Sequence, residues 1–70
     1  MSELTWYEVW VDEGLAPPYV LLLLAQSNEK FEIYDPTEKQ IAFVASTYEA
    51  AKEWLLEDEY TRVDGRMMIE

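Results

Sequence analysis

Apolar and polar residues follow two different periods along this chain, and the change falls near residue 46. Before it, four short segments rich in aromatic and branched residues alternate with turn-forming residues. The segments are residues 5–12, 19–25, 31–34 and 41–45. The intervening turns contain Gly14, Pro17 and Pro18, then Ser27 and Asn28, then Asp35 and Pro36. Because the segments are short and regularly punctuated, the pattern predicts four β-strands.

After residue 46 the period becomes that of a helix. Ser46 and Glu49 have the spacing of a capping box, in which each side chain hydrogen-bonds the backbone of the other residue. Tyr48, Ala51 and Leu55 then fall on one side of a helix, whereas charged residues fall largely on the opposite side. The pattern therefore predicts one amphipathic helix of about three turns.

The stretch YVLLLLAQ has two interpretations. Leucine favours helices, and Pro17 or Pro18 would suit a helix start, so a helix over residues 18–30 is the alternative. The element order would then be β-α-β-β-α-β, the ferredoxin-like arrangement. A surface helix would interleave apolar and polar residues, whereas here they form separate blocks. This segregation favours a buried strand.

We therefore expect a single α+β domain over residues 1–70, an antiparallel meander of four to five strands with one helix on one face. The element order is β-β-β-β-α-β, with the helix over residues 47–58 and the last strand over residues 60–64. The last strand is expected to pair antiparallel with the first, in preference to parallel pairing with the fourth. Residues 65–70 are expected to form a loose tail.

Alternation along each strand assigns its residues to the two faces of the sheet. We expect the helix to cover the face that bears one half of the leucine run and the apolar residues Val9, Val11, Phe31, Ile33, Ile41 and Phe43. The opposite face is then apolar as well, although a one-sided sheet is usually polar there. The residues expected on this second face are Trp6, Glu8, Trp10, Glu32, Tyr34, Ala42, Val44 and the other half of the leucine run.

An apolar face bordered by charge is typical of an interface, and Trp and Tyr are frequent interface anchors. We therefore expect Trp6, Trp10, Tyr34 and Val44 to bind a protein partner, with a homodimer as the simplest form. The alternative is that the loop EGLAPP or the C-terminal residues 67–69 cover this face.

Net charge suggests a second kind of partner. The chain has 15 acidic and 5 basic residues, a formal net charge of −10, so we expect it to bind neither nucleic acid nor membranes. Glu57, Asp58 and Glu59 lie at the predicted C-terminal end of the helix, where the helix dipole disfavours anions. The alternative function is therefore an acidic inhibitor or nucleic-acid mimic of the immunity type, which binds a basic protein through this cluster.

Composition excludes most catalytic chemistry. The chain contains neither Cys nor His, so it lacks the usual zinc ligands, the usual general base and any disulfide. We expect no enzyme activity, no metal and no cofactor. The longest apolar run has seven residues, against about 20 for a membrane span, and MSELTWYEVW does not resemble a signal peptide. We expect a small, cytoplasmic protein–protein interaction module that dimerises or docks through its apolar, aromatic sheet face.

Overall fold

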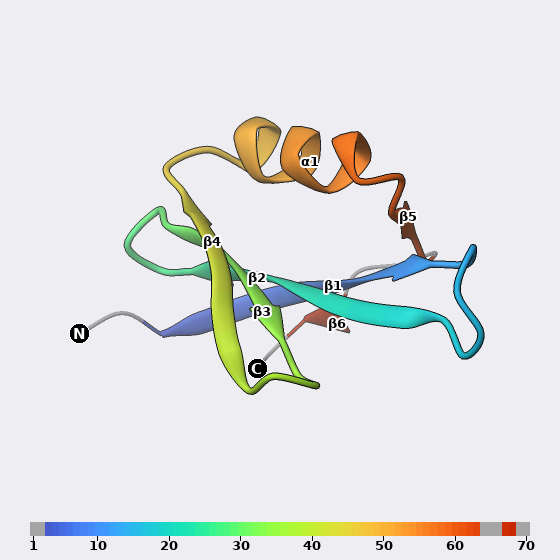
Figure 1. Ribbon diagram of the computed structural model, residues 1–70. Coiled ribbons are helices and arrows are strands. Elements are labelled where there is room, and N and C mark those ends of the chain that lie inside the picture. Colours follow the sequence, from blue (N-terminus) through green and yellow to red (C-terminus); the bar gives the residue numbers. More distant parts are fainter. Residues whose placement is uncertain (1–2, 64–66, 69–70) are drawn as a thin grey trace.

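Four consecutive strands form an antiparallel meander in the computed structural model, which describes residues 3–63 and 67–68 (Figure 1). The strands are β1 (Leu4–Asp12), β2 (Tyr19–Gln26), β3 (Phe31–Asp35) and β4 (Gln40–Ala45). Helix α1 (Tyr48–Glu57) and the short strands β5 (Thr61–Arg62) and β6 (Met67–Met68) follow. The sheet order is β4-β3-β2-β1-β5, and β6 also pairs with β1. The predicted α+β meander is confirmed, and so is the antiparallel pairing of the last predicted strand with the first.

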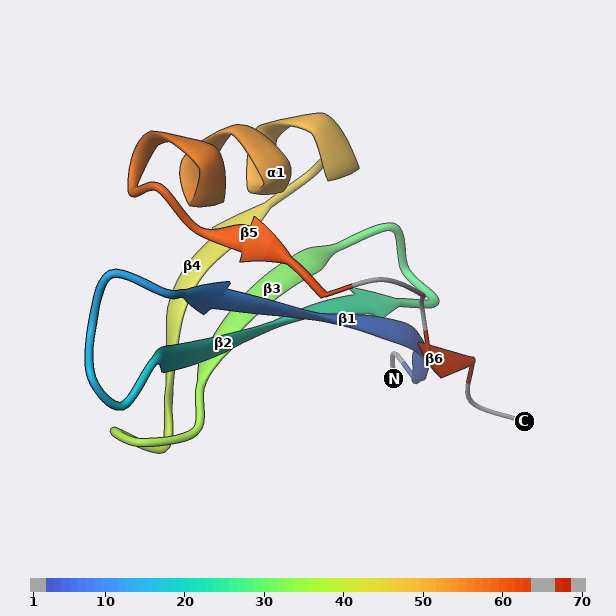
Figure 2. The same cartoon turned by 90° about the vertical axis from the view of Figure 1, so that its right-hand side faces the viewer.

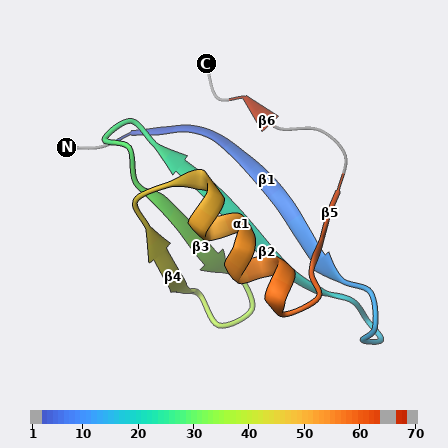
Figure 3. The ribbon, with the colours of Figure 1, turned by 90° about the horizontal axis from the view of Figure 1, so that it is seen from above.

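The molecule has two layers. Helix α1 crosses one face of the sheet and packs on β3 and β4 (Figures 1 and 3). The side view shows no element of the described chain beneath the other face (Figure 2). This second face of the sheet is called the open face below.

Strand β2 contains the leucine run and lies in the middle of the sheet, between β1 and β3. Leu21, Leu23 and Ala25 point toward α1 and are buried, whereas Leu22 and Leu24 lie on the open face and are half-buried. The block of apolar residues therefore reflects a central strand that contributes to the core on one face and to the apolar surface of the open face on the other.

The hydrophobic core lies between the sheet and the helix. Its buried members are Trp10, Leu21, Leu23, Ile33, Ala45, Ala51 and Leu55. Half-buried aromatic residues extend the core to its edges, where Phe43 and Trp54 stack at a centroid distance of 5.2 Å. Each large apolar side chain buried in this way contributes about 1.5–3 kcal/mol to folding.

Strand β1 presents the opposite face to the one expected. In β1, Trp6, Glu8 and Trp10 point under the helix, and Val9 and Val11 lie on the open face; the sequence assignment had the reverse. The two Trp side chains bury more apolar area than the valines, so this orientation gives the larger hydrophobic gain.

In β4, Ile41 lies on the open face rather than in the core. A register shift relative to β3 pairs Ile41 with Tyr34 and Phe43 with Ile33, and this leaves Ala42 as the extra residue of a β-bulge. Because a bulge changes the alternation by one residue, Phe43 remains in the core while Ile41 does not. Ile41 is consequently 43% exposed.

The structure also differs from the sequence-based expectations at the start of α1 and in the C-terminal tail. The N-cap of α1 is Thr47, whose Oγ1 accepts a hydrogen bond from the Ala50 backbone N–H at 3.1 Å, so the expected cap at Ser46 is wrong. Residues 67–68 of the tail, which was expected to be loose, pair with β1 as β6. The rest of the tail lies outside the described residues.

Candidate functional site

The open face carries two rows of side chains that run across four strands, one interrupted by the carboxylate of Glu32 and the other without a charged residue. Strand pairing aligns Tyr7, Leu24, Glu32 and Val44 in one row and Val9, Leu22, Tyr34 and Ile41 in the next. Val11 and Val20 continue the surface along β1 and β2. Leu22 lies in the second row with an apolar neighbour on either side. The result is a continuous apolar surface, rather than scattered exposed side chains.

This surface is most accessible at β4. Its side chains on β1, β2 and β3 are half-buried by their neighbours, whereas Val44 on β4 is 50% exposed. Strand β4 is the outermost strand on its side of the sheet, so no strand shields Val44 from solvent. The largest contiguous apolar surface of a monomeric protein is often a functional one.

The described parts of the two segments that would cover the open face in the alternative interpretation lie elsewhere. Residues 67–68 pair with the edge of β1 as β6 and so extend the sheet sideways (Figure 3), and residue 69 lies outside the described residues. The loop EGLAPP connects β1 to β2 at the end of their hairpin, and all of its residues are exposed. Within the described residues, the open face therefore has no cover from its own chain.

Of the aromatic and aliphatic residues expected to bind a partner, the structure brings two together on the open face. Tyr34 and Val44 lie there, but Trp6 and Trp10 lie on the other side of the sheet under α1. Trp10 is 2% exposed, and the Trp6 ring packs against Phe31 and Tyr48. Their expected exposure for binding is wrong.

Sequence reasoning missed the residues that occupy the open face of β1, namely Tyr7, Val9 and Val11. The sequence does contain a signal for them. Alternation places Glu8 on the same face as the two largest side chains of the strand, and large aromatic residues are buried more often than they are exposed. This signal would have assigned Trp6, Glu8 and Trp10 together to the core.

Glu8 is a carboxylate buried in that core. It is 0% exposed, and it accepts hydrogen bonds from Trp10 Nε1 at 3.2 Å and from the Tyr48 hydroxyl at 3.0 Å. Arg62 of β5 donates from Nη1 to Glu8 Oε2 at 3.2 Å and forms an ion pair with it. This hydrogen bond raises the pKa of the Arg62 guanidinium above its usual value. The Arg62 side chain is 44% exposed, so the pair links the core to the surface at the edge of the sheet.

A second polar group lies at the end of the β3–β4 hairpin. The Tyr19 hydroxyl donates to Asp35 Oδ2 at 2.6 Å, and Asp35 Oδ1 accepts hydrogen bonds from the backbone N–H groups of Thr37 and Glu38. These bonds, above all the one from Tyr19, lower the pKa of Asp35. The same bond raises the pKa of Tyr19. Asp35 therefore caps the turn that was expected at Asp35 and Pro36, and these hydrogen bonds give its carboxylate a structural role.

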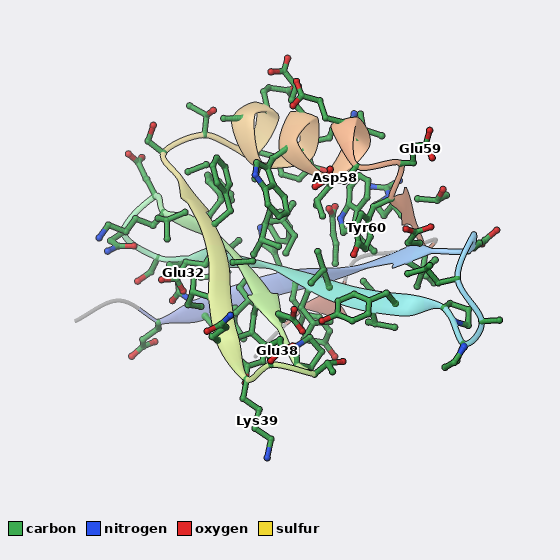
Figure 4. All side chains as sticks on the ribbon, viewed as in Figure 1. Glu32, Glu38, Lys39, Asp58, Glu59 and Tyr60 are labelled. Carbon is green, nitrogen blue, oxygen red and sulfur yellow. The ribbon has the colours of Figure 1, made fainter. Side chains whose placement is uncertain are left out.

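The acidic cluster Glu57, Asp58 and Glu59 lies at the C-terminal end of α1, and all three side chains are exposed. Figure 4 labels Asp58 and Glu59 at this end of the helix. The helix ends in a Schellman motif, in which the Tyr60 N–H donates to the Leu55 carbonyl and the Glu59 N–H donates to the Leu56 carbonyl, each at 3.0 Å. Glu59 occupies the left-handed position of this motif, with φ 63°, where Gly or Asn is usual. The geometry of the cluster follows from how the helix ends.

Charge is distributed unequally between the two sides of the molecule. The helix layer carries the exposed carboxylates of Glu49 and Glu53 as well as those of the acidic cluster. On the open face, as far as its residues are described, Glu32 is the one charged side chain, and Gln26 Nε2 donates to it at 3.0 Å. Lys39 projects from the β3–β4 turn on the side away from α1 (Figure 4). The open face is therefore apolar and nearly neutral, and the helix layer is acidic.

Other kinds of site are not found in the described part of the chain. Residues 3–63 and 67–68 enclose no pocket. Within the same ranges, no three carboxylates lie close enough together to hold a metal ion. The helix that the structure describes is not long and apolar enough to cross a membrane.

In comparisons with known proteins, no family model matches the chain, and no curated protein or solved structure matches it.

Proposed function

We propose that this protein is a small, non-enzymatic protein–protein interaction module and that the open face of its sheet is its docking surface. The observation that carries the proposal is the continuous apolar surface around Leu22, which no described segment of the chain covers. The non-enzymatic part rests on composition, because a chain without His or Cys lacks the commonest general base and the strongest nucleophile.

The open face has further properties that suit docking. Its side chains project from paired strands, so their backbone is already ordered before a partner arrives. Val9, Val11 and Val20 are β-branched and lose little rotamer freedom on contact. Tyr7 and Tyr34 supply the amphipathic aromatic side chains that often anchor interfaces. Binding would therefore bury apolar area at a small cost in conformational entropy.

The competing function is the acidic inhibitor that binds a basic protein through Glu57, Asp58 and Glu59. Salt distinguishes the two, because apolar burial is not screened by ions whereas attraction between exposed charges is. Docking through the open face should persist between about 0.05 and 0.5 M salt. Docking through the acidic cluster should weaken steeply over the same range.

The experiment captures proteins from the source extract with three immobilised variants. Leu22→Glu places a charge at the centre of the open face, and Leu56→Glu places the same charge on the exposed side of α1 as a matched control. The third variant reverses the charges of Glu57, Asp58 and Glu59 to Lys. Circular dichroism confirms that each variant is folded.

We expect Leu22→Glu to lose salt-resistant partners that both other variants retain. Partners that dissociate in salt and are lost only on charge reversal would overturn the proposal in favour of the acidic inhibitor. Retention of every partner by Leu22→Glu would also overturn it.

A further inference from the structure

We infer that the partner on the open face is a second copy of this chain, packed sheet to sheet in a homodimer of four layers, α/β/β/α. The inference rests on the proposed function, because it names the occupant of the same surface. Three properties of the chain lead to a second copy: the distribution of its charge, the size of the open face and the arrangement of its rows.

Charge favours a partner that is as neutral as the open face itself. A basic protein would be attracted to the acidic helix layer on the other side of the molecule. The open face of a second copy is apolar, with Glu32 as its one described charge, so it presents a matching surface. A second copy of this chain therefore has the apolar, nearly neutral surface that the partner needs.

The same arrangement keeps the acidic layers apart. Two sheets pack about 10 Å apart, and an α-helix with its side chains is about 10–12 Å wide. The two helices would thus lie on the outside of the dimer, roughly 30 Å from each other. At 0.1 M salt the Debye length is about 10 Å, so repulsion between two chains of net charge −10 is largely screened.

The size of the open face fits a reversible dimer. With strand spacing of about 4.8 Å and about 3.4 Å per residue, β1 to β4 present roughly 400–500 Å² per copy, or about 900 Å² in total. Stable interfaces usually bury about 1,200–2,000 Å², and weak ones bury less. We therefore expect dissociation in the micromolar range rather than a permanent dimer.

The rows on the open face suit a two-fold axis. In an isologous contact both copies use the same surface, and residues on the two-fold axis meet their own equivalents. The row of Val9, Leu22, Tyr34 and Ile41 spans the four strands, and an axis that runs along this row would bring Leu22 of each copy close to its equivalent. Glu32 and Val44 in the neighbouring row would lie away from the axis. Leu22 is thus the position where a dimer of this kind can be detected.

The first test uses cysteine, because the natural chain has none. Leu22→Cys places a single thiol at the centre of the open face, and Leu56→Cys places one on the exposed side of α1 as the control. On mild oxidation we expect Leu22→Cys to form a disulfide-linked dimer at least about tenfold faster than Leu56→Cys, because the thiols must be in contact to react. Equal rates for the two variants would overturn the inference.

The second test is sedimentation equilibrium of the natural chain and of Leu22→Glu, from about 5 to 500 µM. We expect a monomer–dimer equilibrium that does not weaken in 0.5 M salt. Leu22→Glu should weaken it by about 100-fold or more, because each copy would bury an unpaired charge. A natural chain that stays monomeric throughout would overturn the inference.

The outcomes separate this inference from the proposed function. If the chain is monomeric but Leu22→Glu still loses a salt-resistant partner protein, the second copy is wrong and the docking surface stands. If the chain dimerises equally well with Leu22→Glu, the dimer uses another surface and the inference is overturned. If Leu22→Glu changes neither dimerisation nor capture, both proposals are wrong.

Discussion

Glu8 is a carboxylate that the fold buries completely, on the same face of β1 as the buried Trp10 and the half-buried Trp6. An unpaired charge in this position would be strongly destabilising, so the burial of Glu8 depends on its hydrogen-bond partners. The partners that make burial possible, Tyr48 and Arg62, lie 40 and 54 residues further along the chain. Contacts over such separations depend on the tertiary fold, and alternation within a strand cannot reveal them.

Replacement of Glu8 by Gln is predicted to destabilise the protein by about 2–3 kcal/mol, because charge-assisted hydrogen bonds are lost and an amide N–H₂ is buried in their place. Chemical denaturation monitored by far-UV circular dichroism measures this change. Glu32→Gln is the matched control, since this half-buried carboxylate lies on the open face, and it should change stability by at most about 0.5 kcal/mol. Similar effects for the two variants would mean that the buried network contributes little.

Glu59 carries strain at the end of α1. Its φ of 63° lies in the left-handed region, which costs free energy for a residue with a Cβ atom but not for Gly. Glu59→Gly is therefore predicted to stabilise the protein by about 0.5–1 kcal/mol and to raise Tm by a few degrees.

Thermal denaturation of Glu59→Gly and of a control, Glu53→Gly, tests this prediction. Glu53 is also an exposed glutamate but lies inside α1, where Gly should cost about 1 kcal/mol. A lower Tm for Glu59→Gly than for the natural chain would contradict the assignment of strain to this position.

At the scale of elements, the sequence was a good guide to what forms and a poor guide to which way it faces. The helix expected over residues 47–58 is α1 (Tyr48–Glu57), and the strand expected over residues 19–25 is β2 (Tyr19–Gln26). Period and turn residues act locally, so these elements could be predicted. The face of β1 depends on its register with β2, and the position of Ile41 depends on the bulge at Ala42; both are set by pairing between strands.

The start of α1 illustrates a choice that sequence spacing alone did not decide. Ser46 and Thr47 are adjacent candidates for the N-cap, and the structure uses Thr47. Thr47→Ala is therefore predicted to destabilise the protein by about 1 kcal/mol, and Ser46→Ala by a few tenths at most. Urea denaturation of both variants provides the comparison. A larger loss of stability for Ser46→Ala than for Thr47→Ala would instead support the expected capping box at Ser46.

At the scale of the whole molecule, the two sides of the sheet serve different purposes. The side under α1 holds the core, including all three Trp side chains, so substitution of Trp10 would test folding rather than binding. The other side is apolar without contributing to that core. Because a domain of this size has a small core and no disulfide, an apolar surface left open adds little to stability until it meets a partner.

Stability of the natural chain is accordingly predicted to depend on its concentration. If two copies associate, each hundredfold rise in concentration above the dissociation constant adds about 2.7 kcal/mol per dimer, or about 1.4 kcal/mol per chain. For a domain of this size the gain corresponds to a rise in Tm of roughly 5 °C or more. Calorimetry at about 10 µM and 1 mM should show this rise for the natural chain and for Leu56→Glu, and lose it for Leu22→Glu. If the natural chain has the same Tm at both concentrations, dimerisation does not stabilise its fold and the prediction is wrong.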